Sequence, residues 1–458
     1  MIDEAWIETI AAQTGSERVE VPPEWAELVP ATVQVVPPGV EALQGILAAA
    51  NERRCPVYPV GGGTSLAWGL PGEEPGLALS LRGINGVVDY PARDMTITVR
   101  AGNTVSEVQE TLARERQRLP IDVPNADTAT IGGAVAANVS GPRRFGFGTF
   151  RDYVIGIGVV TADGKLARAG GRVVKNVAGY DLCKLYTGSF GSLAIIVELT
   201  FKVHPMPEKT EAVLVGCSRF EDVEAVLAGS LRSRTRPVVL ELLNRSAWQE
   251  LDSVDLDRDW SIAVVFEGFE EAVAWQVETF LDEVRRWTDG RARAEVVHSP
   301  NAASLVQSLA SFTQRPTPVL AKLNYRPSMT VGLLEELSRL RGTWLLSAHA
   351  NNGIAWLAPA AERSDGEIVD ELAQLRRWAV SADGNLVVRG ASFCARTGFA
   401  PWGVERGDTW LMRRLKQRFD PHGILNRGRF VDHPRAVEPR VQDQPEEPET
   451  ERTATSTP

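Results

Sequence analysis

The stretch Pro59-Val60-Gly61-Gly62-Gly63-Thr64-Ser65 begins at the end of a short apolar segment, Val57–Val60, that is typical of a strand. Three adjacent glycines lack Cβ atoms and leave their backbone N–H groups free to converge on an anion such as a pyrophosphate. Thr64 and Ser65 can add hydroxyl donors. The stretch is not the dinucleotide fingerprint G-x-G-x-x-G, because Leu66 stands where the last glycine would be. Taken alone, it is more typical of a plain loop.

Two further stretches are rich in small residues. Pro124–Asn138 reads PNADTATIGGAVAAN, and its Gly and Ala residues let a large flat ligand approach the start of a helix and its free amides. A tightly packed Ala/Gly helix explains the same pattern equally well. Val174–Leu182, followed by Gly188–Glu198, places glycines in a turn, a helix and a strand. By itself this is simply a helix–turn–strand unit.

In this order and spacing, the three stretches resemble the FAD-binding domain of the vanillyl-alcohol-oxidase type, the PCMH fold, over roughly residues 30–208. Arg172–Asp181, together with Gly188–Glu198, is similar specifically to the FAD-binding subunit of bacterial glycolate oxidase. Phe419–Phe430 resembles the C-terminal end of these flavoproteins, with Arg427 where proline is usual. The resemblance implies an α+β chain, in which a PCMH-type domain of two small α/β subdomains precedes an α+β sheet-and-helix cap and substrate domain.

The resemblance also implies FAD as the cofactor and assigns residues to it. The pyrophosphate would be held by backbone amides of Gly61, Gly62, Gly63, Thr64 and Ser65. The flavin and ribityl chain would be lined by Pro124, Asp127, Thr130, Gly132, Gly133, Asn138 and Gly141, and Ile196 would bind the adenine side. Thr64 stands where some relatives carry a histidine bonded covalently to the flavin, so we expect non-covalent FAD.

The catalytic residues are less well defined. Catalytic relatives carry an H-x-G-D-G-N-x-H stretch, and the nearest counterpart, Ser347–Trp356, keeps one histidine and lacks the aspartate. Asn352-Gly353 favours a two-residue hairpin turn, which makes His349 a strand-end residue more readily than an acid–base group or ligand. The weak catalytic or carboxylate-binding candidates are His349, Lys322, Arg326 and Arg389, and Arg143, Arg144 and Arg151 face either the flavin or solvent.

We divide the chain into a helical segment (1–29), the FAD-binding domain (30–208), an α+β domain (209–432) and an acidic, Pro-rich tail (433–458). The tail has too few apolar residues to offset its ordering entropy, so we expect disorder. In the α+β domain we expect strands at 211–217, 237–243, 261–267, 293–297, 317–325, 343–348, 354–357 and 385–389. Helices are expected near 220–233, 270–287, 300–311, 329–340 and 364–380. The basic residues at 413–418 are expected on a solvated helix face, and the tryptophans in packing and partner contacts.

Composition and charge exclude several functions. The 458 residues carry 49 basic and 59 acidic side chains, a net charge of −10, which argues against a nucleic-acid partner. No apolar run is long enough for a membrane span, and no signal peptide is recognisable. The four cysteines lie far apart, so we expect buried reduced thiols and no metal or iron–sulfur cluster in this chain. We therefore expect a cytoplasmic protein, peripheral to the inner membrane only through partner subunits.

The implied function is that of the FAD-binding subunit of a glycolate oxidase (glycolate dehydrogenase) complex. Glycolate would be oxidised to glyoxylate by hydride transfer to flavin, and the electrons would pass to an iron–sulfur subunit beside a second flavoprotein subunit. Two alternatives stay open. The chain is either a self-sufficient FAD-dependent D-2-hydroxy-acid dehydrogenase of the D-lactate type, or a non-catalytic FAD-binding scaffold of the complex.

Overall fold

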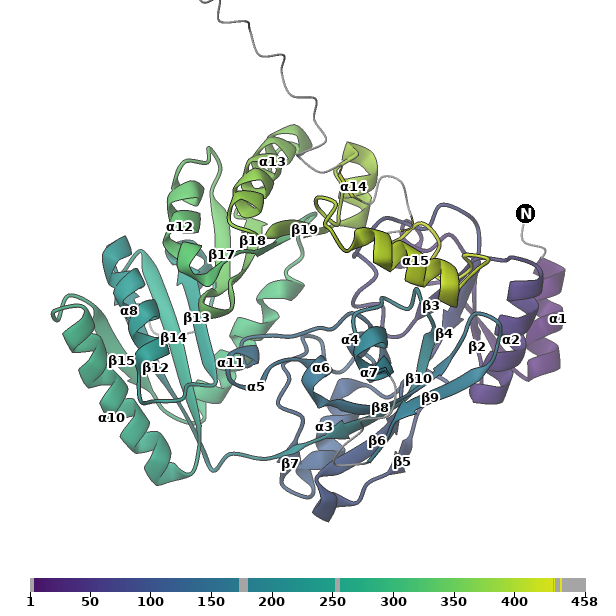
Figure 1. The fold of residues 1–458 in the computed structure, drawn as a ribbon, viewed down its shortest axis with the longest axis horizontal. Helices are drawn as coiled ribbons and strands as arrows, with labels where there is room; N and C mark the ends of the chain where they lie inside the picture. The colour runs from purple at the N-terminus through teal and green to yellow at the C-terminus, as the bar shows by residue number, and fades with distance from the viewer. Residues whose placement is uncertain (1–3, 173–179, 252–255, 431, 433–436, 439–458) are drawn as a thin grey trace, which may run out of the picture.

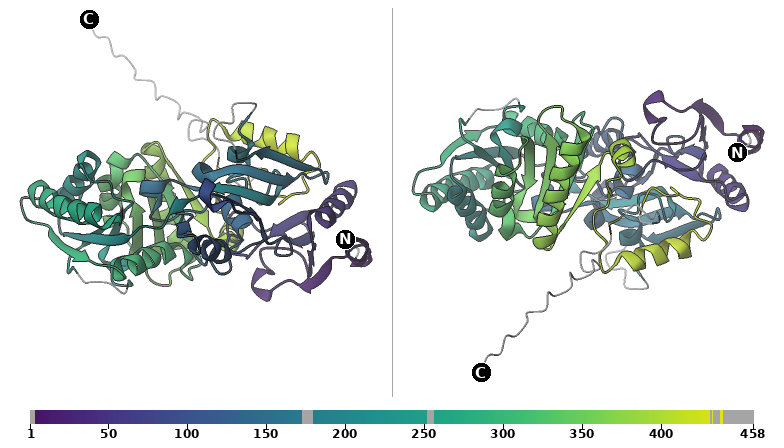
Figure 2. Two further views of the ribbon diagram at one scale, coloured as in Figure 1. Left: turned by 90° about the horizontal axis from the view of Figure 1, so that it is seen from below. Right: turned by 90° about the horizontal axis from the view of Figure 1, so that it is seen from above.

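The computed structural model describes residues 4–172, 180–251, 256–430, 432, 437 and 438. The N-terminal half, residues 4–205, contains two small sheets, and an eight-stranded sheet from residues 209–389 lies beside it (Figure 1). Figure 2 shows this division from two further sides. The mixture of helices and sheets confirms the α+β fold class.

The first small sheet has the order β1 (Glu17–Glu20), β2 (Val33–Val36), β4 (Leu77–Ser80), β3 (Val57–Val60). The three inner strands run parallel, and β1 pairs antiparallel with β2. Helices α1 (Glu4–Thr14) and α2 (Val40–Glu52) are amphipathic, and their apolar faces are buried in the same core as this sheet. Residues 1–29 are therefore not only helical, since β1 completes the sheet.

The second small sheet is antiparallel, with the order β5 (Val87–Asp89), β6 (Thr96–Arg100), β10 (Ile195–Lys202), β8 (Val154–Val160), β9 (Leu166–Gly170). A hairpin joins β8 to β9, with Gly164 at φ +79°. Its helices are α3 (Val105–Ala113), α4 (Ile131–Ala136), α5 (Arg144–Phe147), α6 (Phe150–Tyr153) and α7 (Leu182–Tyr186). Outside this sheet, β7 (Gln117–Arg118) pairs with β11 (His204–Pro205).

The eight-stranded sheet is antiparallel throughout and has the order β15-β12-β14-β13-β17-β18-β16-β19. In chain order its strands are β12 (Lys209–Cys217), β13 (Val239–Asn244), β14 (Trp260–Gly268), β15 (Arg293–Val297), β16 (Leu320–Asn324), β17 (Trp344–His349), β18 (Ile354–Pro359) and β19 (Asn385–Arg389). All eight predicted strands are confirmed.

The two faces of this sheet are covered differently. Helices α8 (Phe220–Arg232), α10 (Glu270–Trp287), α12 (Thr330–Ser338) and α13 (Asp365–Ser381) share one apolar core with the outer face. The inner face packs on α9 (Arg245–Trp248), on α11 (Asn301–Ser311) and on Trp68 and Phe147 of the N-terminal half. The five predicted helices, which are all of these except α9, are confirmed within two residues at each end.

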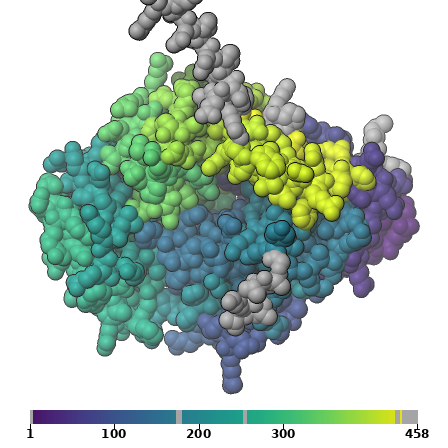
Figure 3. Space-filling view, in the orientation of Figure 1, coloured from purple at the N-terminus to yellow at the C-terminus, as the bar shows by residue number. Residues whose placement is uncertain are grey.

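The chain then returns to the N-terminal half. After α14 (Ala391–Thr397) and α15 (Thr409–Phe419), Leu425 forms a parallel bridge with Val57 and is buried in the core of the first small sheet. The yellow atoms in Figure 3 show these C-terminal residues packed against that half. Residues 209–432 therefore do not form one separate domain as expected, because the end of this range completes the core beside β3.

Two smaller expectations also need correction. Lys416 is not on a solvated helix face, since it is buried and donates to Asp420 and to the carbonyl groups of Ser192 and Leu425. Glu438, inside the segment expected to be disordered, forms a bridge with Val404 and an ion pair with Arg376. Most of 433–458 lies outside the described residues.

The remaining sequence expectations concern membranes and thiols. In the described part of the chain, no helix is both long and apolar enough to cross a membrane. Cys55, Cys183, Cys217 and Cys394 are free and buried, as predicted. Burial raises the pKa of each thiol, which keeps all four in the unreactive protonated form.

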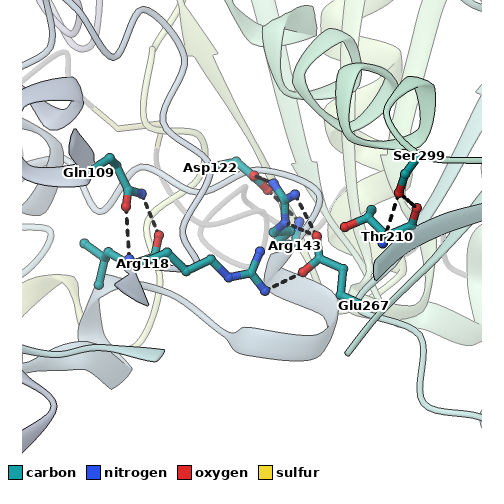
Figure 4. A network of polar contacts seen from close by, with 8 residues as sticks. Gln109, Arg118, Asp122, Arg143, Thr210, Glu267 and Ser299 are labelled. Carbon is teal, nitrogen blue, oxygen red and sulfur yellow. Dashed lines mark hydrogen bonds and ion pairs between the residues drawn. The ribbon is translucent and has the colours of Figure 1, made fainter. Parts of the chain in front are cut away.

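A buried ionic network joins the two halves (Figure 4). Glu267, in β14, has a side chain only 1% exposed and accepts hydrogen bonds from Arg143 at 2.7 Å and Arg118 at 2.5 Å. Arg143 also pairs with Asp122 at 2.5 Å. Burial opposes ionisation of Glu267, but the charges of Arg143 and Arg118 hold its pKa below the ordinary value. Glu267 thus fixes the eight-stranded sheet against the N-terminal half.

We predict that Glu267→Gln destabilises the protein by about 3–5 kcal/mol, because two buried guanidinium groups lose their shared counter-charge. The measurement is urea unfolding at pH 7 followed by tryptophan fluorescence. The wild-type contribution of this carboxylate is complete above its unfolded pKa of about 4.3 and is lost as pH falls through the lower folded pKa. The matched control is Glu335→Gln, whose half-exposed surface pair with Arg339 should contribute almost nothing. Equal stability of the two variants would contradict this role.

Candidate functional site

A cleft with about 960 Å³ of space between its walls, open mouth included, lies within the N-terminal half. One wall is the loop 61–66 after β3, and another is α4 with Ala137. Asn426, Arg429 and Phe430 of the returning C-terminal segment form a third.

The loop Gly61–Ser65 presents an unusual set of backbone groups. Among the described residues, none of its five N–H groups donates to a protein acceptor, and neither do the hydroxyl groups of Thr64 and Ser65. Half-buried N–H groups are normally paired, so five successive free donors on a cleft wall form a concave anion site. This arrangement fits a pyrophosphate.

The glycines of this loop are also required by the protein itself. A Cβ at Gly62 would lie 1.8 Å from the carbonyl oxygen of Thr128, and one at Gly61 would lie 2.0 Å from Oγ1 of Thr130. Gly63 has φ +78°, and a Cβ there would lie 2.3 Å from the Trp25 ring. The absent side chains therefore allow the loop to pack on residues 128–130, which holds its N–H groups in place.

The start of α4 differs from the expectation. Its N–H groups are not free, because Ile131 donates to Asn103, Gly132 donates to the carbonyl of Ala101 and Gly133 donates to the Thr130 hydroxyl. A Cβ at Gly132 would lie 2.6 Å from that of Ala101. The helix thus offers the cleft a smooth wall of small residues rather than amide donors.

The cleft gathers most of the predicted cofactor residues. Its lining includes Gly61, Gly62, Gly63, Thr64, Ser65, Thr130, Gly132, Gly133 and Ile196, but not Pro124, Asp127, Asn138 or Gly141. Asp127 is exposed and accepts a hydrogen bond from Ser106, while Gly141 packs against Asp122. The motif at 173–179 lies outside the described residues.

Several lining residues were not predicted. Trp68 and Trp402 stack with ring centroids 6.0 Å apart and an interplanar angle of 14°, and Phe190 and Phe430 pack on Trp402. These two tryptophans therefore line the cleft and are not only packing anchors. Arg429 is buried and donates to the carbonyl groups of Leu28, Leu66 and Trp68, which fixes the loop's far end. In the sequence, the resemblance at 419–430 is the feature that could have indicated that the C-terminal segment lines this cleft.

The inner face of the eight-stranded sheet carries a second set of polar residues. Glu241 is completely buried and accepts hydrogen bonds of 2.5 Å from the Ser347 hydroxyl and from Nδ1 of His349. His349 ends β17, as predicted, and its Nε2 is buried without a partner among the described residues. Because the proton on Nδ1 is donated to the hydrogen bond with Glu241, Nε2 is the ring nitrogen that can accept a proton.

Three cations accompany this pair. Lys322 lies on the same face, with Nζ 5.3 Å from the centre of the Trp356 ring, and Trp356 contacts Trp68 of the cleft wall edge-on at 6.1 Å. Lys322 is half-buried on this face. Burial, followed by the charge of Arg144, lowers the pKa of Lys322 to about 8. The third cation, Arg389, forms an isolated bridge with Trp68 through its backbone.

Other sequence candidates lie outside this face. Arg326 is exposed and pairs with Asp383, so it is excluded from the site. Asn352-Gly353 is not a two-residue hairpin turn, because Ala350–Asn352 form a 3-10 turn that Gly353 ends at φ +64°. Arg143 belongs to the ionic network and Arg151 is exposed, while Arg144 is half-buried and faces the inner face. In the described chain, no cluster of three His, Cys, Asp or Glu residues can hold a metal ion.

Comparison with known proteins identifies the family of the chain. The model of the FAD binding domain matches residues 31–170, and the model of the C-terminal domain of FAD linked oxidases matches residues 331–430. The chain belongs to the PCMH-type FAD-linked oxidase family. The structure of p-cresol methylhydroxylase shares the fold of this flavoprotein with a TM-score of 0.69, at 14% identity over 95% of this chain and 97% of that one.

Two glycolate oxidase subunits are similar to this FAD-linked oxidase in different ways. Subunit GlcD of Bacillus subtilis is 24% identical over 86% of this chain and 88% of its own length. Subunit GlcE of Escherichia coli is 41% identical, but over only 29% of this chain and 38% of its own length. The cofactor is FAD. We propose the cleft, with its five free N–H groups, as the binding site of this cofactor.

Filling the cleft should displace FAD. Ala136 lines the cleft from α4, so Ala136→Leu adds three carbon atoms without a backbone clash and should weaken FAD binding about tenfold or more. The measurement is the ratio of flavin to protein absorbance after purification, followed by FAD titration. Ala113→Leu, on the exposed side of α3, is the control and should retain wild-type flavin. Full flavin occupancy in Ala136→Leu would show that the cofactor lies elsewhere.

Proposed function

We propose that this flavoprotein is the FAD-binding subunit of a glycolate-oxidase-type complex and oxidises a 2-hydroxy acid to a 2-oxo acid. FAD, when bound, supplies the hydride acceptor. The observation that carries the proposal is the inner face, where Lys322, Arg144 and Arg389 lack an ion-pair partner among the described residues and lie beside the cleft's aromatic wall. Buried cations without counter-charges favour an anionic ligand.

The chain's own residues divide the work of binding and proton transfer. Lys322 and Arg144 attract the substrate carboxylate, and the low polarity around them strengthens this attraction. His349 accepts the hydroxyl proton at Nε2, while Glu241 keeps the ring oriented through Nδ1. Trp68 and Trp356 exclude water from the space between the cleft and the sheet.

Partners and the state of FAD belong to the same proposal. The cleft lining contains no histidine, cysteine or tyrosine among its described residues, which supports non-covalent FAD. The four separate thiols offer no cluster ligands, so the electrons would leave through an iron–sulfur subunit beside a second flavoprotein. The match to GlcD along nearly the whole chain favours the self-sufficient dehydrogenase as the second candidate.

The function is tested by adding glycolate anaerobically to the purified full chain and recording the flavin absorption bands. Bleaching by the chain alone supports an active oxidoreductase, and bleaching only after addition of its co-purified partners supports the subunit role. Bound flavin that no 2-hydroxy acid bleaches under either condition would leave the scaffold reading and overturn the proposed reaction. His349→Gln should slow bleaching by about 10²-fold or more without loss of flavin.

Substrate binding should depend on the charge of Lys322. Because the free protein has Lys322 with a pKa of about 8, the dissociation constant for a carboxylate should rise as pH increases through this value. Lys322→Met should bind weakly at every pH and lose this dependence, whereas the exposed Lys202→Met should behave like the wild type. The measurement is calorimetric titration with glycolate after replacement of oxygen, at pH 6.5–9.5. An unchanged pH profile in Lys322→Met would exclude Lys322 as the carboxylate ligand.

A further inference from the structure

Unpaired positive charge occurs at two places along the inner face. The first combines Lys322 of β16 with Arg144 of α5. These two groups are close enough that the charge of Arg144 adds to burial in lowering the pKa of Lys322. The second is Arg389 of β19, whose two terminal nitrogens reach only the side-chain oxygen of Gln314 and the carbonyl of Arg315, both at 3.4 Å. Burial lowers the pKa of Arg389, so its environment does not compensate its charge.

The neighbouring carboxylates are engaged elsewhere. Glu241 is occupied by Ser347 and His349, and Asp152 accepts from the N–H group of Thr149 at the start of α6. Both act on Arg144 at longer range, yet burial still lowers the pKa of Arg144. Neither carboxylate forms an ion pair with Lys322, Arg144 or Arg389 within the described ranges. The folded chain therefore leaves both places without a counter-ion.

The strand register shows how the two sites of unpaired charge lie relative to each other. Lys322 pairs with Val387, and Leu320 pairs with Arg389. Lys322 and Arg389 are therefore diagonal neighbours on one face, with their Cα atoms about 7–8 Å apart. Arg144 approaches from the opposite side, because α5 packs on β13, at the far side of β17 and β18. One carboxylate can bridge Lys322 and Arg144 with its two oxygens, and both oxygens are then engaged. A monocarboxylate bound by Lys322 and Arg144 would leave Arg389 uncompensated.

The same face carries polar atoms that the protein does not satisfy. Nε1 of Trp356 and Nε2 of His349 have no hydrogen-bond partner among the described residues. Both residues are more than nine-tenths buried, so these atoms are also shielded from solvent. Trp356 lies directly between the strand of His349 and the strand of Lys322. Leaving such groups unpaired is unfavourable, and the hydroxyl group of a ligand can supply a hydrogen-bond partner.

We propose that the substrate of this site is a 2-hydroxy dicarboxylate, a dianion, rather than a monocarboxylate of glycolate type. One carboxylate binds Lys322 and Arg144, the other binds Arg389, and the hydroxyl group between them lies near His349. This inference rests on the proposed function for the identity of the reacting group. The preference of the site for a dianion over a monoanion can be measured by binding alone, without turnover.

The test is calorimetric titration of the full FAD-containing chain with unreactive acids of matched length. Malonate, succinate and glutarate are the dicarboxylate probes, and acetate, propionate and butyrate are the monocarboxylate probes. We expect the best dicarboxylate to bind about tenfold or more tightly than its monocarboxylate match, because a second charged contact is gained. Arg389→Met should reduce this preference to near one, whereas the exposed Arg377→Met on α13 should keep it.

Each outcome decides the inference. Equal or tighter binding of monocarboxylates, no binding of any probe, or an unchanged preference in Arg389→Met would overturn it. If Arg389→Met loses its flavin, Arg389→Lys keeps a charge but not the guanidinium fork, and its preference should fall between one and the wild-type value. Flavin bleaching by glycolate without dicarboxylate binding overturns the inference alone. Dicarboxylate binding without bleaching by glycolate, tartronate, malate or 2-hydroxyglutarate overturns the proposed reaction alone.

Discussion

Five successive backbone N–H groups, from Gly61 to Ser65, have no acceptor in the described protein, and the surrounding structure keeps them in that state. An unrestrained loop would turn such groups toward carbonyls or solvent. Here β3 is held between β4 and the returning segment at Ile424–Asn426, and the glycines pack on Thr128 and Thr130 at distances that no Cβ permits. We propose that these unpaired donors hold the pyrophosphate of FAD, because the protein core keeps them aligned before the cofactor binds.

The second constraint acts between the two halves. Glu267 ties the eight-stranded sheet to Arg118 and Arg143, and Trp68 packs on Trp356 beside this link. The same contact brings Arg144 over the inner face, near Glu241 and Lys322. A flavin in the cleft and a substrate on the sheet would therefore meet at a boundary built from both halves. The stability of the protein and the geometry of its reaction depend on one packed surface.

The secondary structure of the eight-stranded sheet was predictable because its strands and helices alternate with clear apolar periods and short connections. The glycine-rich loop was predictable less directly, because three adjacent glycines alone are more typical of a plain loop. Its order with the other two stretches gave the resemblance to an FAD-binding domain. By contrast, Asp127 and Gly141 belong to the right stretch but lie outside the cleft lining. Trp68, Trp402 and Arg429 line the cleft, but their positions depend on contacts between segments more than 300 residues apart.

The sequence by itself determined the α+β class, the strands and helices of the second sheet, the glycine loop and the absence of cluster-binding cysteines. These follow from local periodicity, backbone freedom and residue type, which act over a few residues. Only the tertiary structure decided that Lys322, Arg144 and Arg389 share one half-buried surface without counter-charges among the described residues, and that Arg326 does not. Charge compensation depends on which side chains meet across strands and between the two halves, and no local pattern encodes that meeting.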